Sequence, residues 1–363
     1  MSEKKLRVGI IGSGWIANVA HVPAWKNLSD SVKVVANADL NPEIAATFAR
    51  ANGIANHYGD YAAMLANESL DIVSVCTPNA YHKEATLAAL AAGAHVLCEK
   101  PIATCRPDAV EMYAAAERAG RLLMVGQSSR FEGSAFAARD IVASGQLGEI
   151  YFAETTMLRR SGIPTWGQFH MMEGSGGGPI YDLGVHILDL VIWIMGNPKV
   201  TAVSATTFTK FGDRDQGKNA LPNGALTPRP YDYREFDVED FAGGFLRLEN
   251  GGSIALKTSW AAYIPTPHRS GHMLLGTEGG MTFRPLTVTS RTDGETVTVE
   301  PELPAGRTGP FPGHFGETEN FVKAIRGEEE LLVKREEVLN VMGALDALYA
   351  SAAAGREVAV ATD

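Results

Sequence analysis

An apolar stretch at residues 94–98 is followed by two charged residues, Glu99 and Lys100, and then by Pro101. Proline cannot donate a ladder hydrogen bond, and it restricts the residue before it to extended or turn geometry. We therefore expect Lys100 at the carboxyl end of a strand, where open α/β sheets place their ligands. A charged pair at such a point indicates chemistry, although a solvated ion pair at a strand end would have the same sequence.

A second set of residues that could move protons lies in a predicted helix that begins at Pro179. Asp182 and His186 are four positions apart and share one face of this helix, and Asp189 could orient the second ring nitrogen of His186. Because histidine accepts protons near neutral pH, Asp182, His186 and a nearby Lys100 would remove a hydroxyl proton while hydride leaves the same carbon. The same spacing fits a metal pair or a polar helix face, but no third metal ligand is evident nearby.

A glycine-rich turn directly follows the apolar stretch 6–11 and has the pattern G-x-G-x-x-A. Gly12 permits a tight turn, Gly14 lets the backbone approach a pyrophosphate, and the final alanine lets a helix pack on the strand. The N–H groups at the start of that helix bind phosphates. The motif therefore predicts a dinucleotide site, which includes Trp15 and Ile16.

Asp39 ends the next strand-like stretch, at residues 32–38. It lies where a ribose-binding carboxylate is expected, about 20 residues beyond the glycines. A carboxylate there accepts hydrogen bonds from ribose hydroxyls and repels a 2′-phosphate, and Leu40 offers no guanidinium to such a phosphate. The sequence thus favours NAD over NADP. The competing interpretation is that Asp39 is a simple turn residue before Asn41.

The elements that would position these residues alternate between strand and helix in the first third of the chain. Strands are expected at 6–11, 32–38, 72–76, 94–98 and 122–126, and helices at 42–52, 60–67, 80–92 and 107–119. This alternation is typical of βαβ units with a parallel sheet. Residues 1–126 are therefore predicted to form a Rossmann dinucleotide-binding domain.

The pattern changes at Gln127. Strands are expected at 151–158, 200–209, 241–248, 252–259 and within 281–299, and helices at 179–195, 315–326 and 336–354. Residues 127–363 thus predict an α+β domain with a large, mostly antiparallel, open-faced sheet, which gives an α/β fold class overall. Residues 213–235 are expected to form a surface loop near the substrate or an oligomer contact, or a plain insertion.

Composition limits the classes of partner and compartment. The chain has 363 residues, a formal net charge of -10 and no cluster of lysine and arginine, which argues against nucleic acid and anionic membranes. Its 3 cysteines show no C-x-x-C spacing, so neither a metal site nor a redox pair is expected. Without a predicted signal peptide or spanning segment, we expect a cytoplasmic protein.

In combination, these motifs resemble the Gfo/Idh/MocA family of sugar and cyclitol oxidoreductases over nearly the whole chain. The resemblance depends on Gly12-Ser13-Gly14, Asp39, residues 77–82, Glu99-Lys100-Pro101, Arg130-Phe131, the glycine run that leads to Asp182 and His186, and residues 351–356. The Glu-Lys-Pro run and the glycine-to-histidine run are the specific ones among them. The resemblance implies an NAD-dependent dehydrogenase with Lys100, Asp182 and His186 as its catalytic residues.

The resemblance also implies a role for each matching residue. Lys100 would contact the reacting hydroxyl, His186 would act as the general base, and Asp182 would bind substrate hydroxyls. The implied cofactor-binding residues are Thr77, Pro78, Asn79, His82, Glu99, Lys100, Gln127 and Arg130. An ammonium beside the hydroxyl stabilises a developing alkoxide, so Lys100 would stay charged in that role and be neutral as a base.

The segment from Arg159 to Trp166 resembles one that frames the substrate in part of this family. Trp166 could stack on a pyranose ring, and Arg160 or His170 could bind hydroxyls, although an ordinary packed loop has the same composition. The implied substrate is a sugar, glycoside or inositol, oxidised at a ring hydroxyl.

Two alternatives to a simple dehydrogenase remain: transient oxidation that permits glycoside cleavage or elimination, and a non-enzymatic NAD-binding regulator. A homo-oligomer, a dimer or tetramer, is expected from the open sheet face.

Overall fold

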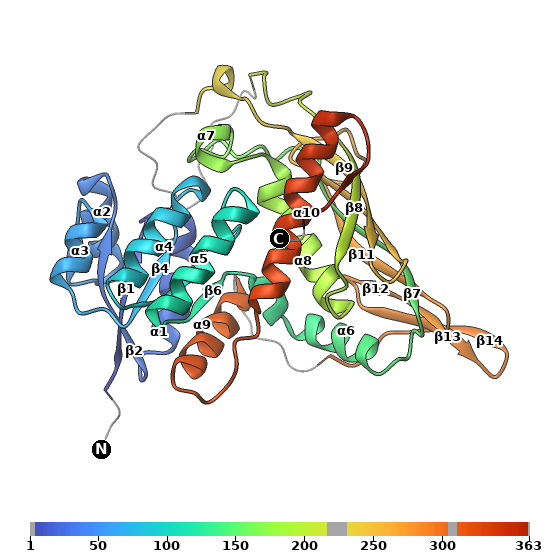
Figure 1. Ribbon diagram of the computed structural model, residues 1–363, viewed down its shortest axis with the longest axis horizontal. Coiled ribbons are helices and arrows are strands. Elements are labelled where there is room, and N and C mark those ends of the chain that lie inside the picture. Colours follow the sequence, from blue (N-terminus) through green and yellow to red (C-terminus); the bar gives the residue numbers. More distant parts are fainter. Residues whose placement is uncertain (1–3, 216–230, 304–310, 362–363) are drawn as a thin grey trace.

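The computed structural model describes residues 4–215, 231–303 and 311–361, and its first part is a parallel sheet with helices on its faces (Figure 1). The strand order is β3-β2-β1-β4-β5-β6, with every neighbouring pair parallel. The strands are β1 (Leu6–Ile11), β2 (Val32–Ala38), β3 (Asn56–Tyr58), β4 (Ile72–Val75), β5 (His95–Cys98) and β6 (Leu123–Val125). This topology reverses direction at β1, so ligands are expected beyond the carboxyl ends of β1 and β4.

The helices of this part are α1 (Val22–Asn27), α2 (Pro42–Asn52), α3 (Tyr61–Asn67), α4 (His82–Ala91) and α5 (Arg106–Ala119). Local chemistry explains where they begin and end. The side chain of Asn41 accepts hydrogen bonds from the first two free N–H groups of α2, at 3.0 and 3.3 Å. Gly53 and Gly120 end α2 and α5 in the left-handed conformation that glycine adopts without strain.

The second sheet has the order β14-β13-β12-β11-β7-β10-β9-β8-β15. Only the β7–β10 pair is parallel among its described pairs, so the predicted mostly antiparallel sheet, and with it the fold class, is confirmed. The strands are β7 (Ile150–Arg159), β8 (Val200–Phe208), β9 (Phe241–Leu248), β10 (Ser253–Ser259), β11 (His268–Gly276), β12 (Gly279–Phe283), β13 (Thr287–Thr292), β14 (Glu295–Val299) and β15 (Val358–Ala359).

Helices cover one face of this sheet. The helices after the first domain are α6 (Gly133–Ala143), α7 (Met172–Ser175), α8 (Val185–Ile194), α9 (Pro312–Ile325) and α10 (Arg335–Ala354), and of these α8 and α10 pack on the sheet. In Figure 1, α8 and α10 lie between the sheet and the first domain, and the opposite face carries no helix within the described residues. Although α9 comes late in the chain, it packs against α1 of the first domain.

The helix that carries Asp182 and His186 is the core helix of the second domain. It opens with a π-helical turn, Ile180–Gly184, and continues as α8. The segment Met172–Ile194 is long and apolar enough to cross a membrane, but 89% of its most apolar window is buried inside the protein. That burial is what the core helix of a soluble fold shows.

Candidate active site

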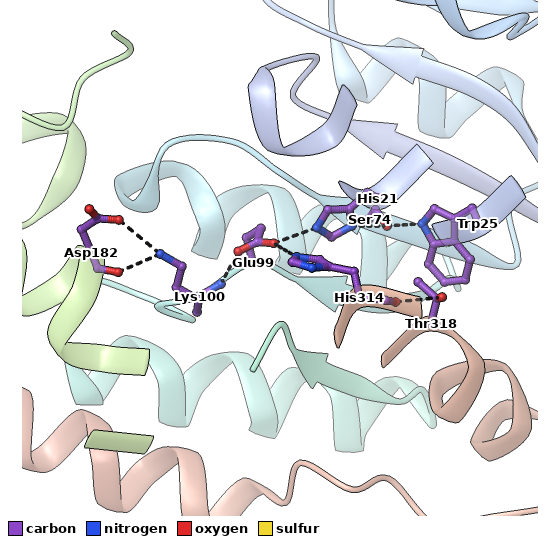
Figure 2. Close-up of polar contacts among 8 residues, drawn as sticks. All are labelled: His21, Trp25, Ser74, Glu99, Lys100, Asp182, His314 and Thr318. Carbon is purple, nitrogen blue, oxygen red and sulfur yellow. Dashed lines mark hydrogen bonds and ion pairs between the residues drawn. The ribbon is translucent and has the colours of Figure 1, made fainter. Parts of the chain in front are cut away.

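Lys100 and Asp182 meet where the two domains face each other. Lys100 lies two residues beyond the end of β5, followed by a cis peptide bond to Pro101. Its Nζ lies 3.0 Å from the backbone oxygen of Asp182 and 3.4 Å from the carboxylate Oδ1 (Figure 2). An ammonium has three N–H donors, so Asp182 leaves one of them available to a substrate hydroxyl.

The glycine run before Asp182 has a packing reason. A Cβ on Gly178 would lie 2.0 Å from the backbone oxygen of Glu239, and one on Gly177 would lie 1.9 Å from the Tyr349 hydroxyl. The buried Glu239 carboxylate accepts N–H groups of Gly178 and Ile180, each at 3.0 Å. The free N–H groups at the start of the helix are thereby satisfied, and the turn that carries Asp182 is held in place.

Electrostatics keep Asp182 ionised. Burial raises the pKa of its carboxyl, but the positive charges of Lys100 and Arg159 and the hydrogen bond from Trp260 outweigh burial and hold it below its usual value. The indole Nε1 of Trp260 donates to Asp182 Oδ2 at 2.8 Å. The second oxygen of the carboxylate is therefore fixed by a residue that follows β10.

His186 lies one helical turn beyond Asp182. Burial and the nearby Lys100 charge lower the pKa of His186 to about 3, against the opposite effect of Asp182. The imidazole is therefore neutral at neutral pH and can accept a proton. Its Nδ1 has no hydrogen-bond partner among the described residues.

A cavity of about 750 Å³ lies at the carboxyl ends of β1, β2 and β4. Eight of the predicted cofactor-binding residues line it: Gly12, Gly14, Trp15, Ile16, Asp39, Thr77, Pro78 and Asn79. Its other wall comes from the second domain, through residues 166–169, Gly174 and Ser175. The Asn79 side chain donates to the Ser175 backbone oxygen at 2.8 Å and joins the two walls.

The glycine motif fits a dinucleotide. Gly12 has a φ of +92°, and a Cβ there would lie 2.6 Å from the backbone oxygen of Cys76. Nothing lies within 4 Å of a Cβ placed on Gly14, so the backbone is open to a close ligand. Asp39 accepts N–H groups from Ser13 at 3.0 Å and Asn41 at 2.9 Å, which orients its carboxylate at the edge of the cavity.

Lys100, which the resemblance also implies as a cofactor residue, does not line this cavity, and neither do four others. His82 lies between the backbone oxygens of Thr77 and Pro101, at 2.9 and 2.7 Å, and so links the cavity wall to the Lys100 segment. Gln127 is buried, and the Glu99 carboxylate points behind Lys100 into the protein (Figure 2).

The fourth, Arg130, is buried in an ion pair. Its Nε and Nη2 donate to the two oxygens of Asp189 at 2.7 and 2.6 Å, and its Nη1 contacts Glu337. The interpretation of Asp189 as a partner of His186 is therefore wrong, because both carboxylate oxygens face Arg130.

The predicted substrate-binding residues are more widely spread. Trp166 lines the nucleotide cavity and meets Phe169 edge-on, with ring centroids 6.1 Å apart. Arg160 is exposed, and its guanidinium donates to the Pro265 backbone oxygen at 3.3 Å. His170 is buried against the Tyr231 ring. The predicted surface loop at 213–235 lies largely outside the described residues, since 216–230 are not described.

Sequence reasoning missed four neighbours of the predicted catalytic residues: Trp260, Arg159, His21 and His314. Trp260 directly follows a strand end, which is the signal that revealed Lys100. His21 and His314 have no such signal, since one lies in the first helix and the other nearly 300 residues later. Together with Glu99 they offer three ligand atoms within 4.8 Å of one another, the arrangement among described residues that could hold a metal.

Comparison with known proteins assigns both domains. Residues 6–127 match the family described as "Oxidoreductase family, NAD-binding Rossmann fold", and residues 136–282 match "GFO/IDH/MocA C-terminal domain". The first match confirms the predicted NAD-binding Rossmann fold.

Relatives extend the match over the whole chain. D-glucoside 3-dehydrogenase of Escherichia coli (strain K12) is 34% identical over 358 residues, which cover 99% of this chain and 98% of that one. Levoglucosan dehydrogenase of Pseudarthrobacter phenanthrenivorans is 27% identical over 77% of this chain and 74% of that protein. The solved structure "Levoglucosan dehydrogenase, complex with NADH and L-sorbose" has a TM-score of 0.84 at 25% identity and covers 99% of this chain and 100% of that chain. The chain belongs to the Gfo/Idh/MocA family of NAD-binding sugar oxidoreductases.

Proposed function

We propose that the protein oxidises a ring hydroxyl of a sugar or glycoside, with NAD as the hydride acceptor and Lys100, Asp182 and His186 as the catalytic residues. The observation that carries this proposal is the Lys100–Asp182 contact, which sets an ammonium with one remaining N–H donor beside the histidine. The D-glucoside and levoglucosan dehydrogenases among the relatives favour a pyranose or glycoside over an inositol.

The three side chains divide the work by charge. The Lys100 ammonium donates to the substrate hydroxyl and stabilises the negative charge that develops on its oxygen. Neutral His186 accepts the hydroxyl proton, and the Asp182 carboxylate, held by Trp260, stabilises the imidazolium that forms. The bound nicotinamide supplies a hydride acceptor. Because Lys100 is beside the ionised Asp182, we assign charge stabilisation to Lys100 and proton acceptance to His186.

NAD is the proposed cofactor in preference to NADP. The Asp39 carboxylate lies at the cavity edge, and the next side chain, Leu40, is 79% exposed and carries no charge. A 2′-phosphate there would meet a negative charge without a compensating guanidinium. Replacement of Asp39 by serine should lower the ratio of kcat/KM with NAD to kcat/KM with NADP.

The test of this function is a panel of stereochemically varied sugars, glycosides and inositols, assayed for NADH formation. We expect turnover with at least one glucopyranose or methyl glucoside. Formation of a cleaved product without net NADH would instead support the redox-neutral alternative. Cofactor binding without any turnover on the panel would support a regulator and overturn the dehydrogenase.

We further infer a cytoplasmic homo-oligomer that pairs the uncovered sheet faces. Phe208, Phe241 and Phe245 share this face, since Phe208 pairs with Phe241 across the strands and Phe245 lies four residues further along β9. Phe208 and Phe245 are 43% and 37% exposed. Light scattering should give a multiple of the chain mass, and replacement of Phe208 and Phe245 by glutamate should reduce it.

A further inference from the structure

A buried polar cluster lies directly behind Lys100, on the side away from Asp182 (Figure 2). Its centre is the Glu99 carboxylate, which is 6% exposed. Oε1 lies 2.8 Å from His21 Nε2 and 3.5 Å from His314 Nε2. Oε2 accepts the backbone N–H of Lys100 at 3.1 Å. One carboxylate thus joins two histidines to the backbone of the reacting lysine.

The direction of the hydrogen bonds in this cluster is set by its fixed donors and acceptors. Trp25 Nε1 can only donate, and it does so to the Ser74 hydroxyl oxygen at 2.8 Å. The Ser74 hydroxyl lies 3.3 Å from His21 Nδ1, to which its own hydrogen can be donated. An ionised carboxylate only accepts, so His21 Nε2 carries the hydrogen that reaches Glu99.

His314 is held between the nucleotide cavity and Glu99. Its ring meets Phe311 edge-on with centroids 5.8 Å apart, and it meets His21 with centroids 5.6 Å apart. Phe311 in turn meets Trp15, which lines the cavity, with centroids 5.4 Å apart. The orientation of His314 is therefore fixed by aromatic packing that begins at the cofactor site.

The cluster keeps Glu99 charged. Burial raises the pKa of its carboxyl, but the hydrogen bonds from His21 and His314 outweigh burial and hold it well below its usual value. The distances fit hydrogen bonds better than a shared metal. Two ligands of one tetrahedral ion at about 2.0–2.1 Å lie about 3.3 Å apart, which exceeds the 2.8 Å between His21 and Glu99.

Lys100 needs such an anchor because it lies beyond β5. The strand ends at Cys98, so the backbone N–H of Lys100 has no neighbouring strand to bond and donates to Glu99 instead. We propose that His21 and His314 are positioning residues that clamp Glu99, and that Glu99 thereby sets the position of Lys100 relative to Asp182 and the substrate. The catalytic part of this inference rests on the proposed function.

The test replaces each histidine by leucine, which removes the donor, and by glutamine, whose Nε2 can still donate to Glu99. With methyl β-D-glucoside and NAD, the leucine variants should lose about 10–100-fold in kcat, since an error of about 1 Å in a catalytic group costs up to about 100-fold. NADH affinity should stay unchanged, and the glutamine variants should recover most of the loss. If the histidines only stabilised the fold, their replacement would lower the free energy of unfolding. It would not lower kcat while NADH affinity stays unchanged.

His272→Leu is the matched control. His272 is also buried, at 3% exposure, and bonds through Nδ1 to the Thr155 hydroxyl at 2.8 Å, but it lies on β11 in the second sheet. The His272→Leu protein should have a lower free energy of unfolding and an unchanged kcat. The proposal is overturned if His272→Leu lowers kcat as much as His21→Leu and His314→Leu, or if both of the latter keep wild-type kcat. A stoichiometric metal in the wild type that is lost in His21→Leu would overturn it as well.

Crystal structures of the NADH-bound variants separate this inference from the proposed function. In His21→Leu and His314→Leu, the contacts of Lys100 Nζ with Asp182, 3.0 and 3.4 Å in the wild type, should lengthen, and they should persist in the glutamine variants. If no sugar is turned over but these contacts change as stated, the proposed function fails and the positioning role stands. If Lys100 keeps its place in the leucine variants, the positioning role fails.

Discussion

Two buried polar clusters hold distant parts of this chain together, and they are built in opposite ways. In the first, Arg130 bonds both oxygens of Asp189 and also contacts Glu337. In the second, Glu99 accepts from His21 and from the backbone of Lys100, with His314 beside it. The first cluster joins three ions of both signs, whereas the second joins one anion to hydrogen-bond donors.

The difference indicates what each cluster is for. Arg130, Asp189 and Glu337 are paired with one another, and these ion pairs fix the junction between segments 130, 189 and 337. The Glu99 cluster ends at Lys100, whose side chain is 15% exposed and still has a donor to offer. We therefore expect changes near Lys100 to affect turnover and changes around Arg130 to affect stability.

The largest effect on turnover is expected at the exposed end of the Glu99 cluster. Lys100→Met removes the charge that stabilises the developing alkoxide and should lower kcat by about 10³–10⁴-fold. His186→Ala should have a similar effect through loss of the proton acceptor. Both variants should bind NADH with nearly wild-type affinity and unfold near the wild-type midpoint. Retained turnover in both variants would refute these roles.

The Arg130 cluster should give the opposite result. Arg130→Met leaves the Asp189 and Glu337 carboxylates buried without their cation, which should cost about 3–5 kcal/mol in the free energy of unfolding. Urea titration measures this loss. Protein that remains folded should keep most of its kcat, and restoring the positive charge with Arg130→Lys should recover part of the stability. A large loss of kcat in stable protein would instead place Arg130 in the active site.

The sequence indicated individual members of these two clusters but not the clusters themselves. Both domains, the parallel sheet and the nucleotide turn follow from local signals, because strand periodicity and glycine spacing are confined to short segments. Glu99 and Lys100 were visible as a strand end, but His21 and His314 are brought to them by tertiary packing, which no short pattern records. The same reason explains why Arg130 and Asp189 were assigned separately to the cofactor and to His186.

Several elements were also missed, and the two longest of them, β11 and α6, were missed for local reasons. The strand β11 carries His268, Arg269, His272 and two glycines, so it lacks the alternation of apolar residues that predicts a strand. Its pairing with both β7 and β12 stabilises it in the sheet regardless. The helix α6 begins at Gly133 without a side-chain cap, and alanine-rich sequence leaves its boundaries unmarked.

Glu317 differs from the carboxylates of both clusters, because it has no hydrogen-bond partner among the described residues. It is fully buried, neither oxygen has a hydrogen-bond partner among the described residues, and burial raises its pKa to about 8. The folded protein therefore binds this proton more tightly than the unfolded chain, whose glutamate pKa is about 4.3. The stability from Glu317 is complete below about pH 4 and is lost as pH rises to about 8.

Glu317→Gln should remove that dependence. The free energy of unfolding of the variant, relative to wild type, should rise with pH between about 5 and 8, by at most about 1.4 kcal/mol per pH unit. Urea titrations at several pH values measure the slope. Glu329→Gln, on the surface of the same region, is the control and should leave the slope nearly unchanged. A flat difference for Glu317→Gln would show that the carboxyl is paired in solution.

The smallest effect is expected at Trp260, whose indole N–H holds the second carboxylate oxygen of Asp182. Trp260→Phe keeps the aromatic packing but removes the N–H that Asp182 Oδ2 accepts at 2.8 Å. A hydrogen bond to a charged group contributes about 1.5–3 kcal/mol, and because water can replace it at the 16%-exposed Asp182, we expect only about a tenfold loss in kcat/KM. Loss of the donor also raises the pKa of Asp182, so the acidic limb of the pH–rate profile should move upward. A loss as large as that of Lys100→Met would mean that Trp260, rather than Glu99, sets the position of the Lys100–Asp182 pair.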